Sequence, residues 1–582
     1  MKCKGWLVEI FLFCIAIFLP IVAQAQFTFI TNNGAITLTG YTGNPTSLSV
    51  PGTITSLAVV NIADGAFANA TSLTTFTLSG GITNIGNAAF SNCVSLGTFS
   101  LTVFVKGMGT NVFANCRSLS NCTFSTSLTN LPDGTFLGCA KLTNNPLVSS
   151  LTTLGNSAFS GCGFSTFTMP NYVTSIGTNL FANCTNLTTF TLGSGLTNLP
   201  DGMFSGCSKL TFNPLNGLIT KIGNSVFSGC GYSGFTMQTQ VKSIGTYLFA
   251  NCTNLTSFTF GTVLTGVPDG MFSGCSKLTS SPLVSTISSL GSSAFAGCGF
   301  SSFDMPQNIK SIGTNAFANC TNMTFFQFAG GLTNVPDTTF YGCSKLTANP
   351  LNSSLISLGN SVFTGCGFTF FQVPATIESI GTNVFANCNN LTNVIIANGF
   401  PNIGDYMFLD DSKLSSISIA PSVTNIGYEA FYGCTSLTNI SIPASVTNID
   451  EFAFANCSKL GAVYCHGGPP AADASIFDSD NSAVVFYPRG FSDWTSNYAG
   501  ISAFLWNPQP QTSDGSFGFR SNQFGFNITD ANNSGAVVEA TTNLAVPNWQ
   551  TVQTKSLSNG TSYFSDSHST NSPVRYYRLR MP

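Results

Sequence analysis

The sequence predicts a repeat solenoid, a leucine-rich repeat array with one parallel β-sheet face, followed by a small antiparallel β-sandwich. Two periodic features and the composition predict this class. A phenylalanine recurs every 22 or 23 residues, a cysteine follows most of these phenylalanines by three residues, and only 7% of the 582 residues are charged. One such coil cannot close a core alone, so we expect the coils to stack and bury one another.

The chain begins with a segment typical of export. Lys2 and Lys4 precede an apolar run from Ile10 to Val22, and the small-x-small sequence Ala-Gln-Ala ends at Ala25. This pattern predicts a secretory signal peptide over residues 1–25. The run of 13 apolar residues is shorter than the roughly 20 that a membrane span needs. We therefore expect a secreted or cell-surface protein with no membrane span after signal cleavage.

The recurring phenylalanine defines the coil. A typical coil has Ile85-Gly86, then Ala89-Phe90, Cys93, and a segment from Leu96 to Leu101. We expect the last segment to form the strand of the parallel face, the Ile-Gly pair to turn a corner, and the Ala-Phe pair to lie on the opposite wall with its ring inward. The expected inward ladder includes Phe181, Phe204, Phe227, Phe249, Cys184, Cys207, Cys230 and Cys252.

A second period of 68 residues is superimposed on the first, so three coils form one duplicated block. An aspartate recurs in one register within it, and a lysine follows each aspartate by eight residues. The aspartates are Asp133, Asp201, Asp269 and Asp337. At about 4.8 Å per stacked coil they lie ~14 Å apart, beyond the screening length of about 8 Å. This spacing favours solubilising surface charges over a cation site, which needs several converging oxygens.

The repeated coils resemble the Treponema-type, BspA-like class of leucine-rich repeats. The resemblance rests on the signature Ile-Gly-x-x-Ala-Phe-x-x-Cys-x-x-Leu, which recurs many times from about Phe27 to Phe504, for example from Ile426 to Leu437. It implies a bacterial surface protein that binds host or matrix molecules. It implies no set of active-site residues.

The composition changes along the chain and suggests its domain organisation. We expect the solenoid, with its two caps, to cover residues 26–506, a proline-bearing linker to cover 507–513, and a sandwich-like domain to cover 514–582. This last domain is similar to a β module at the C-terminus of secreted bacterial proteins. Ten acidic residues gather between Asp405 and Asp493, which favours a solvated acidic rim, with a cation site as the alternative.

Eighteen cysteines remain after signal removal, yet their placement argues against a disulfide framework. Sixteen of them, up to Cys457, share one inward column, while Cys122 and Cys465 fill apolar strand positions. Parallel side chains in one column do not provide the facing Cβ vectors that a disulfide needs. We expect buried thiols bonded to backbone, with some oxidised adjacent pairs or a zinc ladder as alternatives.

The sequence offers little for catalysis or cofactor binding. Its only histidines, His466 and His568, lie in turn-rich segments without the neighbours of a triad or general base, so we expect them to be incidental surface residues. We predict no enzyme, no cofactor and no metal. The formal net charge of −3 also argues against a nucleic-acid partner.

The strand residues that point outward form the candidate ligand-binding face. Most carry hydroxyl groups, and three aromatic residues interrupt them. The selected residues are Thr75, Thr77, Thr189, Thr191, Phe212, Ser257, Thr259, Phe325 and Phe370. Repeat arrays use such extended faces for recognition, so we predict adhesion to an extracellular protein or glycan. The alternative is a passive rod that displays the C-terminal domain at the cell surface.

Overall fold

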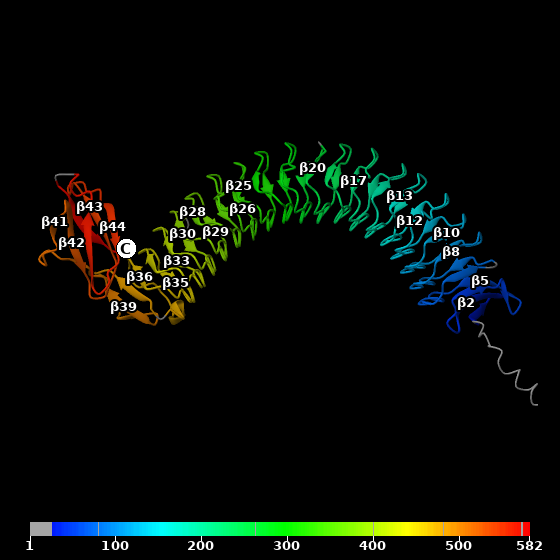
Figure 1. The fold of residues 1–582 in the computed structure, drawn as a ribbon, viewed down its shortest axis with the longest axis horizontal. Helices are drawn as coiled ribbons and strands as arrows, with labels where there is room; N and C mark the ends of the chain where they lie inside the picture. The colour runs from blue at the N-terminus through cyan, green and yellow to red at the C-terminus, as the bar shows by residue number, and fades with distance from the viewer. Residues whose placement is uncertain (1–25, 79–80, 262, 400, 481, 572–573) are drawn as a thin grey trace, which may run out of the picture. The chain divides into compact units, whose positions relative to one another are not determined.

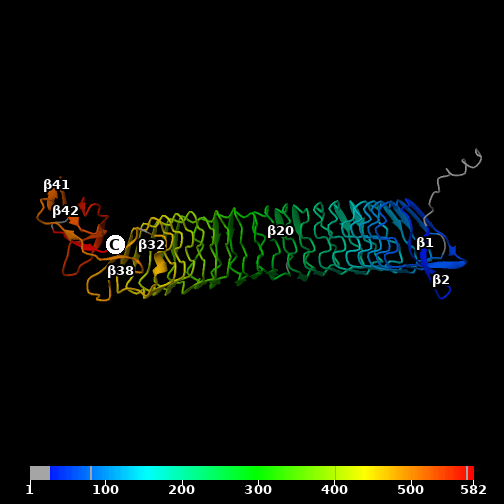
Figure 2. The same cartoon turned by 90° about the horizontal axis from the view of Figure 1, so that it is seen from below.

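The computed structural model describes residues 26–582 except 79–80, 262, 400, 481 and 572–573. The predicted signal peptide lies outside the described residues. The chain divides into two compact units, Met1–Cys252 and Thr253–Pro582. Both contain stacked coils whose strands pair in parallel, so the predicted solenoid class is confirmed (Figures 1 and 2). No helix in the described part of the chain is long and apolar enough to cross a membrane.

Most coils have a first strand, which we assign to the first row, and a shorter second strand, which we assign to the second row. The first row of unit 1 consists of β3 (Ser47–Val50), β6 (Thr75–Leu78), β8 (Thr98–Ser100), β10 (Asn121–Thr123), β13 (Thr166–Thr168), β15 (Thr189–Thr191) and β18 (Gly234–Thr236). The first row of unit 2 consists of β20 (Ser257–Thr259), β23 (Ser302–Asp304), β25 (Phe325–Gln327), β28 (Phe370–Val373), β30 (Asn393–Ile396), β32 (Ser416–Ser418), β34 (Asn439–Ile442), β36 (Ala462–Cys465), β37 (Val484–Tyr487) and β39 (Ile501–Leu505).

The second row begins with the longer β5 and continues with two-residue strands, most of which end in an inward-facing aliphatic residue. In unit 1 they are β5 (Leu57–Ile62), β7 (Asn84–Ile85), β9 (Gly107–Met108), β11 (Asn130–Leu131), β12 (Thr153–Leu154), β14 (Ser175–Ile176), β16 (Asn198–Leu199), β17 (Lys221–Ile222) and β19 (Ser243–Ile244). In unit 2 they are β21 (Gly266–Val267), β22 (Ser289–Leu290), β24 (Ser311–Ile312), β26 (Asn334–Val335), β27 (Ser357–Leu358), β29 (Ser379–Ile380), β31 (Asn402–Ile403), β33 (Asn425–Ile426) and β35 (Asn448–Ile449).

The first row is divided into short sheets, and most of the divisions arise because one coil of each 68-residue block has no first-row strand. A proline occupies the third position of the missing strand at Pro146, Pro214, Pro282 and Pro350. Proline has no N–H for a sheet ladder. The preceding asparagine compensates in three of these coils, since its side-chain amide donates to a strand carbonyl of the next coil. The bonds are Asn145–Thr168 at 3.0 Å, Asn213–Thr236 at 2.9 Å and Asn349–Gln372 at 2.8 Å.

The core of each unit is a column of stacked phenylalanine rings. From Phe67 to Phe249 successive ring centroids lie 5.2–6.2 Å apart, and from Phe272 to Phe477 they lie 5.2–6.1 Å apart. Inward strand phenylalanines such as Phe190 meet this column edge-on. Offset stacked and edge-on pairs are the favourable geometries for aromatic rings.

The backbone beside the column phenylalanines from Phe67 to Phe454 is left-handed at two positions per coil. Around Phe113, for example, Asn111 has a φ of 56° and Asn115 a φ of 61°. Glycine and asparagine adopt this region most readily, which explains why one of them recurs two residues after most column phenylalanines. Alternate backbone N–H groups in this part of the coil donate to carbonyl oxygens of the next coil. For example, the N–H of Phe113 donates to the carbonyl oxygen of Thr135 at 2.9 Å.

Both ends of the array have additional strands. At the N-terminal end, β1 (Phe27–Asn32) pairs antiparallel with β2 (Ala35–Tyr41), which pairs parallel with β5, and β4 (Thr53–Ile54) pairs antiparallel with β5. At the other end, the 3-10 helix η1 (Ala474–Phe477) carries the last column phenylalanine, and β38 (Asn497–Tyr498) pairs with β39.

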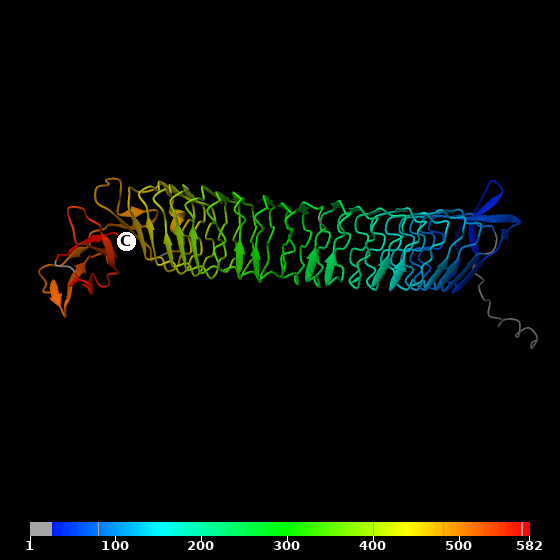
Figure 3. The ribbon, with the colours of Figure 1, turned by 90° about the horizontal axis from the view of Figure 1, so that it is seen from above.

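The C-terminal residues form two antiparallel sheets around a small core, as predicted (Figure 3). One sheet contains β40 (Gln509–Pro510), β41 (Gly518–Arg520), β42 (Gln523–Thr529) and β45 (Thr561–Asp566), and the other contains β43 (Ala536–Thr541), β44 (Gln550–Lys555) and β46 (Tyr576–Arg580). We call these strands the C-terminal module. Strand β40 lies within residues 507–513, so part of the segment predicted as a linker pairs with β42.

Candidate functional site

The exposed side chains of the first row alternate with buried ones. In β15, Thr189 and Thr191 are exposed while the ring of Phe190 points into the core. Parallel pairing with β13 places Thr166 beside Thr189 and Thr168 beside Thr191. Hydroxyl groups of neighbouring coils therefore form rows at about 4.8 Å spacing. Thr75 and Thr77 in β6 and Ser257 and Thr259 in β20 are exposed in the same way.

The three aromatic residues selected from the sequence are all exposed, but they occupy two kinds of position. Phe325 in β25 is 41% exposed and Phe370 in β28 is 46% exposed. Each has an exposed glutamine two residues later in its strand. Phe212 is 63% exposed and lies at a bend, because its coil contains Pro214 in place of a strand. Only two of the three therefore belong to the strand face.

The column cysteines are buried and are not exposed to a ligand. The Sγ of each column cysteine from Cys93 to Cys252 donates to the carbonyl of the column phenylalanine one coil back, at 3.1–3.3 Å. Burial raises the pKa of Cys184 and of Cys252 to about 12 and raises that of Cys207 well above its usual value. The described residues contain no disulfide at these positions and no group of three ligating side chains that could hold a metal ion.

The aspartates of the 68-residue register cap backbone in the next coil. Asp133 Oδ1 accepts from the N–H of Asn156 at 2.7 Å, and Asn156 Oδ1 accepts from the N–H of Thr178 at 2.8 Å. The other aspartates of the register cap the next coil in the same way, at 2.7–2.8 Å. In three of the four blocks the capped residue is an asparagine that in turn caps a third coil, at 2.8–2.9 Å, whereas Asp269 caps Ser292.

Two aspartates of the expected acidic rim are buried in the cysteine column instead. Asp411 and Asp480 occupy the position three residues after a column phenylalanine, where sixteen other coils have cysteine. Burial raises the pKa of Asp411 well above its usual range, although the N–H of Cys388 donates to it, and burial raises the pKa of Asp480 to about 7. The expectation of a solvated rim is therefore wrong for these two residues.

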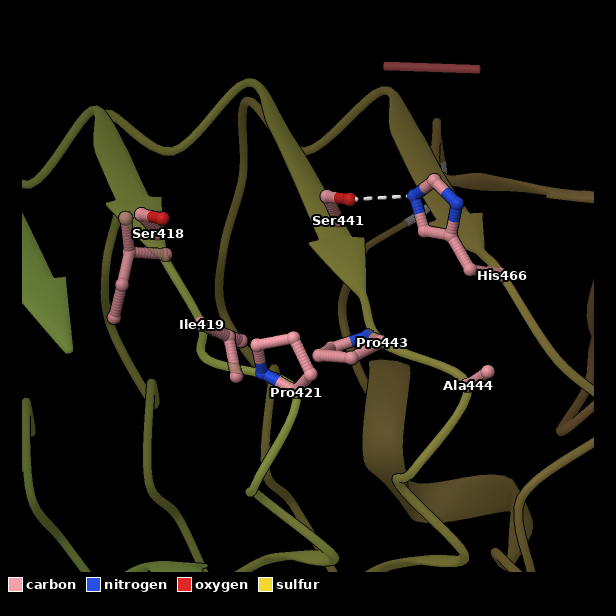
Figure 4. A pocket seen from close by; sticks show the side chains of 8 residues that line it. Ser418, Ile419, Pro421, Ser441, Pro443, Ala444 and His466 are labelled. Carbon is pink, nitrogen blue, oxygen red and sulfur yellow. Dashed lines mark hydrogen bonds between the residues drawn. The ribbon is translucent and has the colours of Figure 1, made fainter. Parts of the chain in front are cut away.

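An open hollow of about 480 Å³ lies over the last coils of unit 2 (Figure 4). Proline and isoleucine side chains form one part of it, and Ser418, Ser441 and His466 form its polar part. His466 is half-buried and bonded, so the expectation of an incidental surface histidine is wrong for this residue. Its Nε2 lies 2.7 Å from Ser441 Oγ and 2.9 Å from the carbonyl oxygen of Pro582.

The serine–histidine contact holds the chain and does not prepare a nucleophile. Ser441 Oγ donates to the carbonyl of Pro582 at 3.0 Å. All three contacts are satisfied when Nε2 of His466 carries the proton and the serine hydroxyl points to Pro582. In this arrangement Nε2 cannot accept the proton of Ser441, as a general base would have to. Burial lowers the pKa of His466, which favours this neutral form at neutral pH.

The C-terminal module covers the final strands of the first row. Tyr464 and Phe486 replace the exposed hydroxyls of earlier coils, and Met581 packs against both. The N–H of Gly535 donates to Tyr464 Oη at 2.8 Å, and Trp506 Nε1 donates to the carbonyl of Gly535 at 2.8 Å. Sequence reasoning missed this junction, although the change from Thr and Ser to Tyr and Phe at outward positions was visible in the sequence.

Comparison with known proteins identifies the repeat class. The family model described as a BspA type leucine rich repeat region (six copies) matches residues 60–188, 131–256, 174–299, 242–368 and 356–482. The chain therefore belongs to the BspA-type leucine-rich repeat family. No curated protein matches the chain significantly.

Solved structures of bacterial leucine-rich repeat proteins are similar to the chain. A leucine-rich repeat protein from Bacteroides ovatus is 21% identical, with 84% of this chain and 99% of that chain covered and a TM-score of 0.31. A leucine rich cell surface protein from Faecalibacterium prausnitzii is 20% identical, with 81% and 96% covered and a TM-score of 0.29. The leucine-rich repeat protein of T. pallidum is 27% identical, with 36% and 88% covered and a TM-score of 0.27.

Proposed function

We propose that the chain is an exported, non-catalytic adhesion protein that binds an extracellular protein or glycan through the first-row strands. The observation that carries the proposal is the alternation in strands such as β15, β20 and β25, in which a buried phenylalanine is flanked by two exposed side chains. Rows of hydroxyls in fixed register present repeated hydrogen-bonding groups without the cost of ordering a loop.

Two exposed aromatic residues support binding through this face over the alternative of a passive rod. Phe325 and Phe370 are exposed on strands, where they offer aromatic contact area beside the amides of Gln327 and Gln372. Large side chains that become fully desolvated near the centre of an interface carry most of its binding energy. A rod that only displayed the C-terminal module would need neither ring at the surface.

The proposal is tested with a glycan and extracellular-matrix array probed with the full chain. For each ligand that the wild type captures, the affinity of the double variant Phe325→Ser, Phe370→Ser is then measured. We expect capture of a ligand and at least a fivefold weaker affinity for this variant, in line with the cost of truncating about one strong interface contact. The rod alternative predicts the same retention for both proteins.

A further inference from the structure

A cleft that the adhesion proposal does not use lies in unit 2 beside strand β46. One hollow, of about 340 Å³, has Arg489, Trp506, Pro508 and Leu579 among its lining residues. A second hollow, of about 270 Å³, is lined by aromatic residues of the C-terminal module. Pro510 and Leu579 line both hollows, so the two adjoin and form one cleft.

One wall of the cleft is the end strand of a sheet. Strand β46 pairs antiparallel with β43, from Arg580 opposite Val537 to Tyr576 opposite Thr541, and it is the last strand in the order β44-β43-β46. An end strand presents alternate N–H and C=O groups on its outer side, and these groups are able to pair with an added chain.

The second hollow has the shape and chemistry for an apolar side chain. The ring of Phe517, 48% exposed, meets Phe524 edge-on at 5.1 Å, and Phe524 stacks on Tyr577 at 5.1 Å. These rings give the hollow an aromatic lining, and Leu579 lines both this hollow and the neighbouring one.

The charges around the cleft are basic. Arg489, Arg575 and Arg578 line it, and neither hollow is lined by an acidic residue. Arg575 and Arg578 already form ion pairs with Asp566 and Glu539. Arg489 is exposed and donates to the neutral Asn507 Oδ1 at 2.7 Å, and no ion pair to it is present in the described part of the chain.

We propose that this cleft binds an extended, acidic segment of a partner polypeptide by strand addition. The segment pairs with the outer edge of β46, inserts one apolar side chain between Phe517 and Tyr577, and places a carboxylate near Arg489. A second copy of β46 fits less well. Antiparallel pairing of two such strands brings the arginines of one close to those of the other, and like charges opposite each other are destabilising.

The test is selection from a phage-displayed library of random dodecapeptides on the full, immobilised chain. We expect selected peptides to contain Asp or Glu together with an apolar residue. Bound as synthetic peptides, they should slow hydrogen exchange at the amides of Tyr576–Arg580. Arg489→Glu and Phe517→Ala should each raise the dissociation constant at least about fivefold. Arg520→Glu and Phe519→Ala, which change exposed residues outside the cleft, should leave it unchanged.

Three outcomes overturn the proposal. They are a selection that yields no specific peptide, peptides that leave the amides of β46 unprotected, and peptides that bind both cleft variants as tightly as the wild type. Peptides rich in lysine and arginine would contradict the acidic partner in particular. The cleft variants leave the first-row face intact, so a failure here is distinct from a failure of the adhesion proposal.

Discussion

The backbone N–H of Cys388 donates a 2.6 Å hydrogen bond to the carboxyl of Asp411, which is fully buried in the next coil. Asp411 takes the place of a column cysteine, and its second carboxyl oxygen has no hydrogen-bond partner. A cysteine at this position would donate its thiol proton to the carbonyl of the column phenylalanine one coil back, as its neighbours do. A carboxyl group therefore interrupts an otherwise continuous column of neutral thiols.

The buried carboxyl should make stability depend on pH. Burial raises the pKa of folded Asp411, so its contribution to stability is complete below the unfolded pKa of about 3.9 and is lost as pH rises through the folded pKa. We expect Asp411→Cys to raise the free energy of unfolding by about 1–3 kcal/mol at pH 8. The gain should be smaller at pH 4. Urea unfolding of both proteins at the two pH values measures this, and an equal gain at both would contradict it.

The column phenylalanines should dominate the stability of the stack. Phe249 is fully buried, whereas Phe212 is 63% exposed. We expect Phe249→Ala to cost about 3–5 kcal/mol because it leaves a cavity, and Phe212→Ala to cost under about 0.5 kcal/mol. Chemical denaturation monitored by circular dichroism compares the two. Equal midpoints for the two variants would mean that the column does not form the core.

The cysteines should be reduced and unreactive in the folded protein. Burial raises the pKa of thiols such as Cys139 and Cys320, each to about 12, and the thiolate is the reactive form. We expect almost no alkylation by a maleimide under native conditions at pH 7. After denaturation, mass spectrometry should show alkylation of the described cysteines. Adjacent column cysteines joined in disulfide-linked peptides would contradict the hydrogen-bonded thiol column.

A charge on the first row should weaken ligand capture without unfolding the chain. Thr189 and Ser257 are exposed on β15 and β20, and exposed substitutions usually change stability by less than about 0.5 kcal/mol. We expect Thr189→Asp and Ser257→Asp each to reduce capture on the array. Asn198→Asp, on the exposed position of β16 in the second row, is the matched control.

The junction with the C-terminal module should depend on one hydroxyl group. Tyr464 Oη is the acceptor for the buried N–H of Gly535. Tyr464→Phe leaves this donor unpaired, which costs about 1–3 kcal/mol. We expect faster hydrogen exchange at Gly535 and earlier proteolysis near Trp506. Tyr563→Phe, at an exposed position of β45, should change neither rate.

The sequence by itself determined the coil and its inward columns. An interval of 22 or 23 residues places each phenylalanine above its counterpart, and the cysteines three residues later follow for the same reason. The exposed positions of the first row were also predictable, because side chains alternate along a strand. The interruptions by Pro146 and its three equivalents could have been predicted from their spacing of 68 residues, since proline removes a ladder donor wherever it falls.

Only the tertiary structure decided which residues of neighbouring coils, and of the C-terminal module, contact one another. The amide of Asn213 replaces a strand bond only because the carbonyl of Thr236 lies opposite it in the next coil. His466 contacts Pro582 across 116 residues, and no periodicity connects these two positions. Docking of the C-terminal module depends on the complementarity of surfaces that are distant in the sequence. The spacing of residues along the chain encodes the repeat. Contacts between the solenoid and the C-terminal module, by contrast, arise only when both have folded.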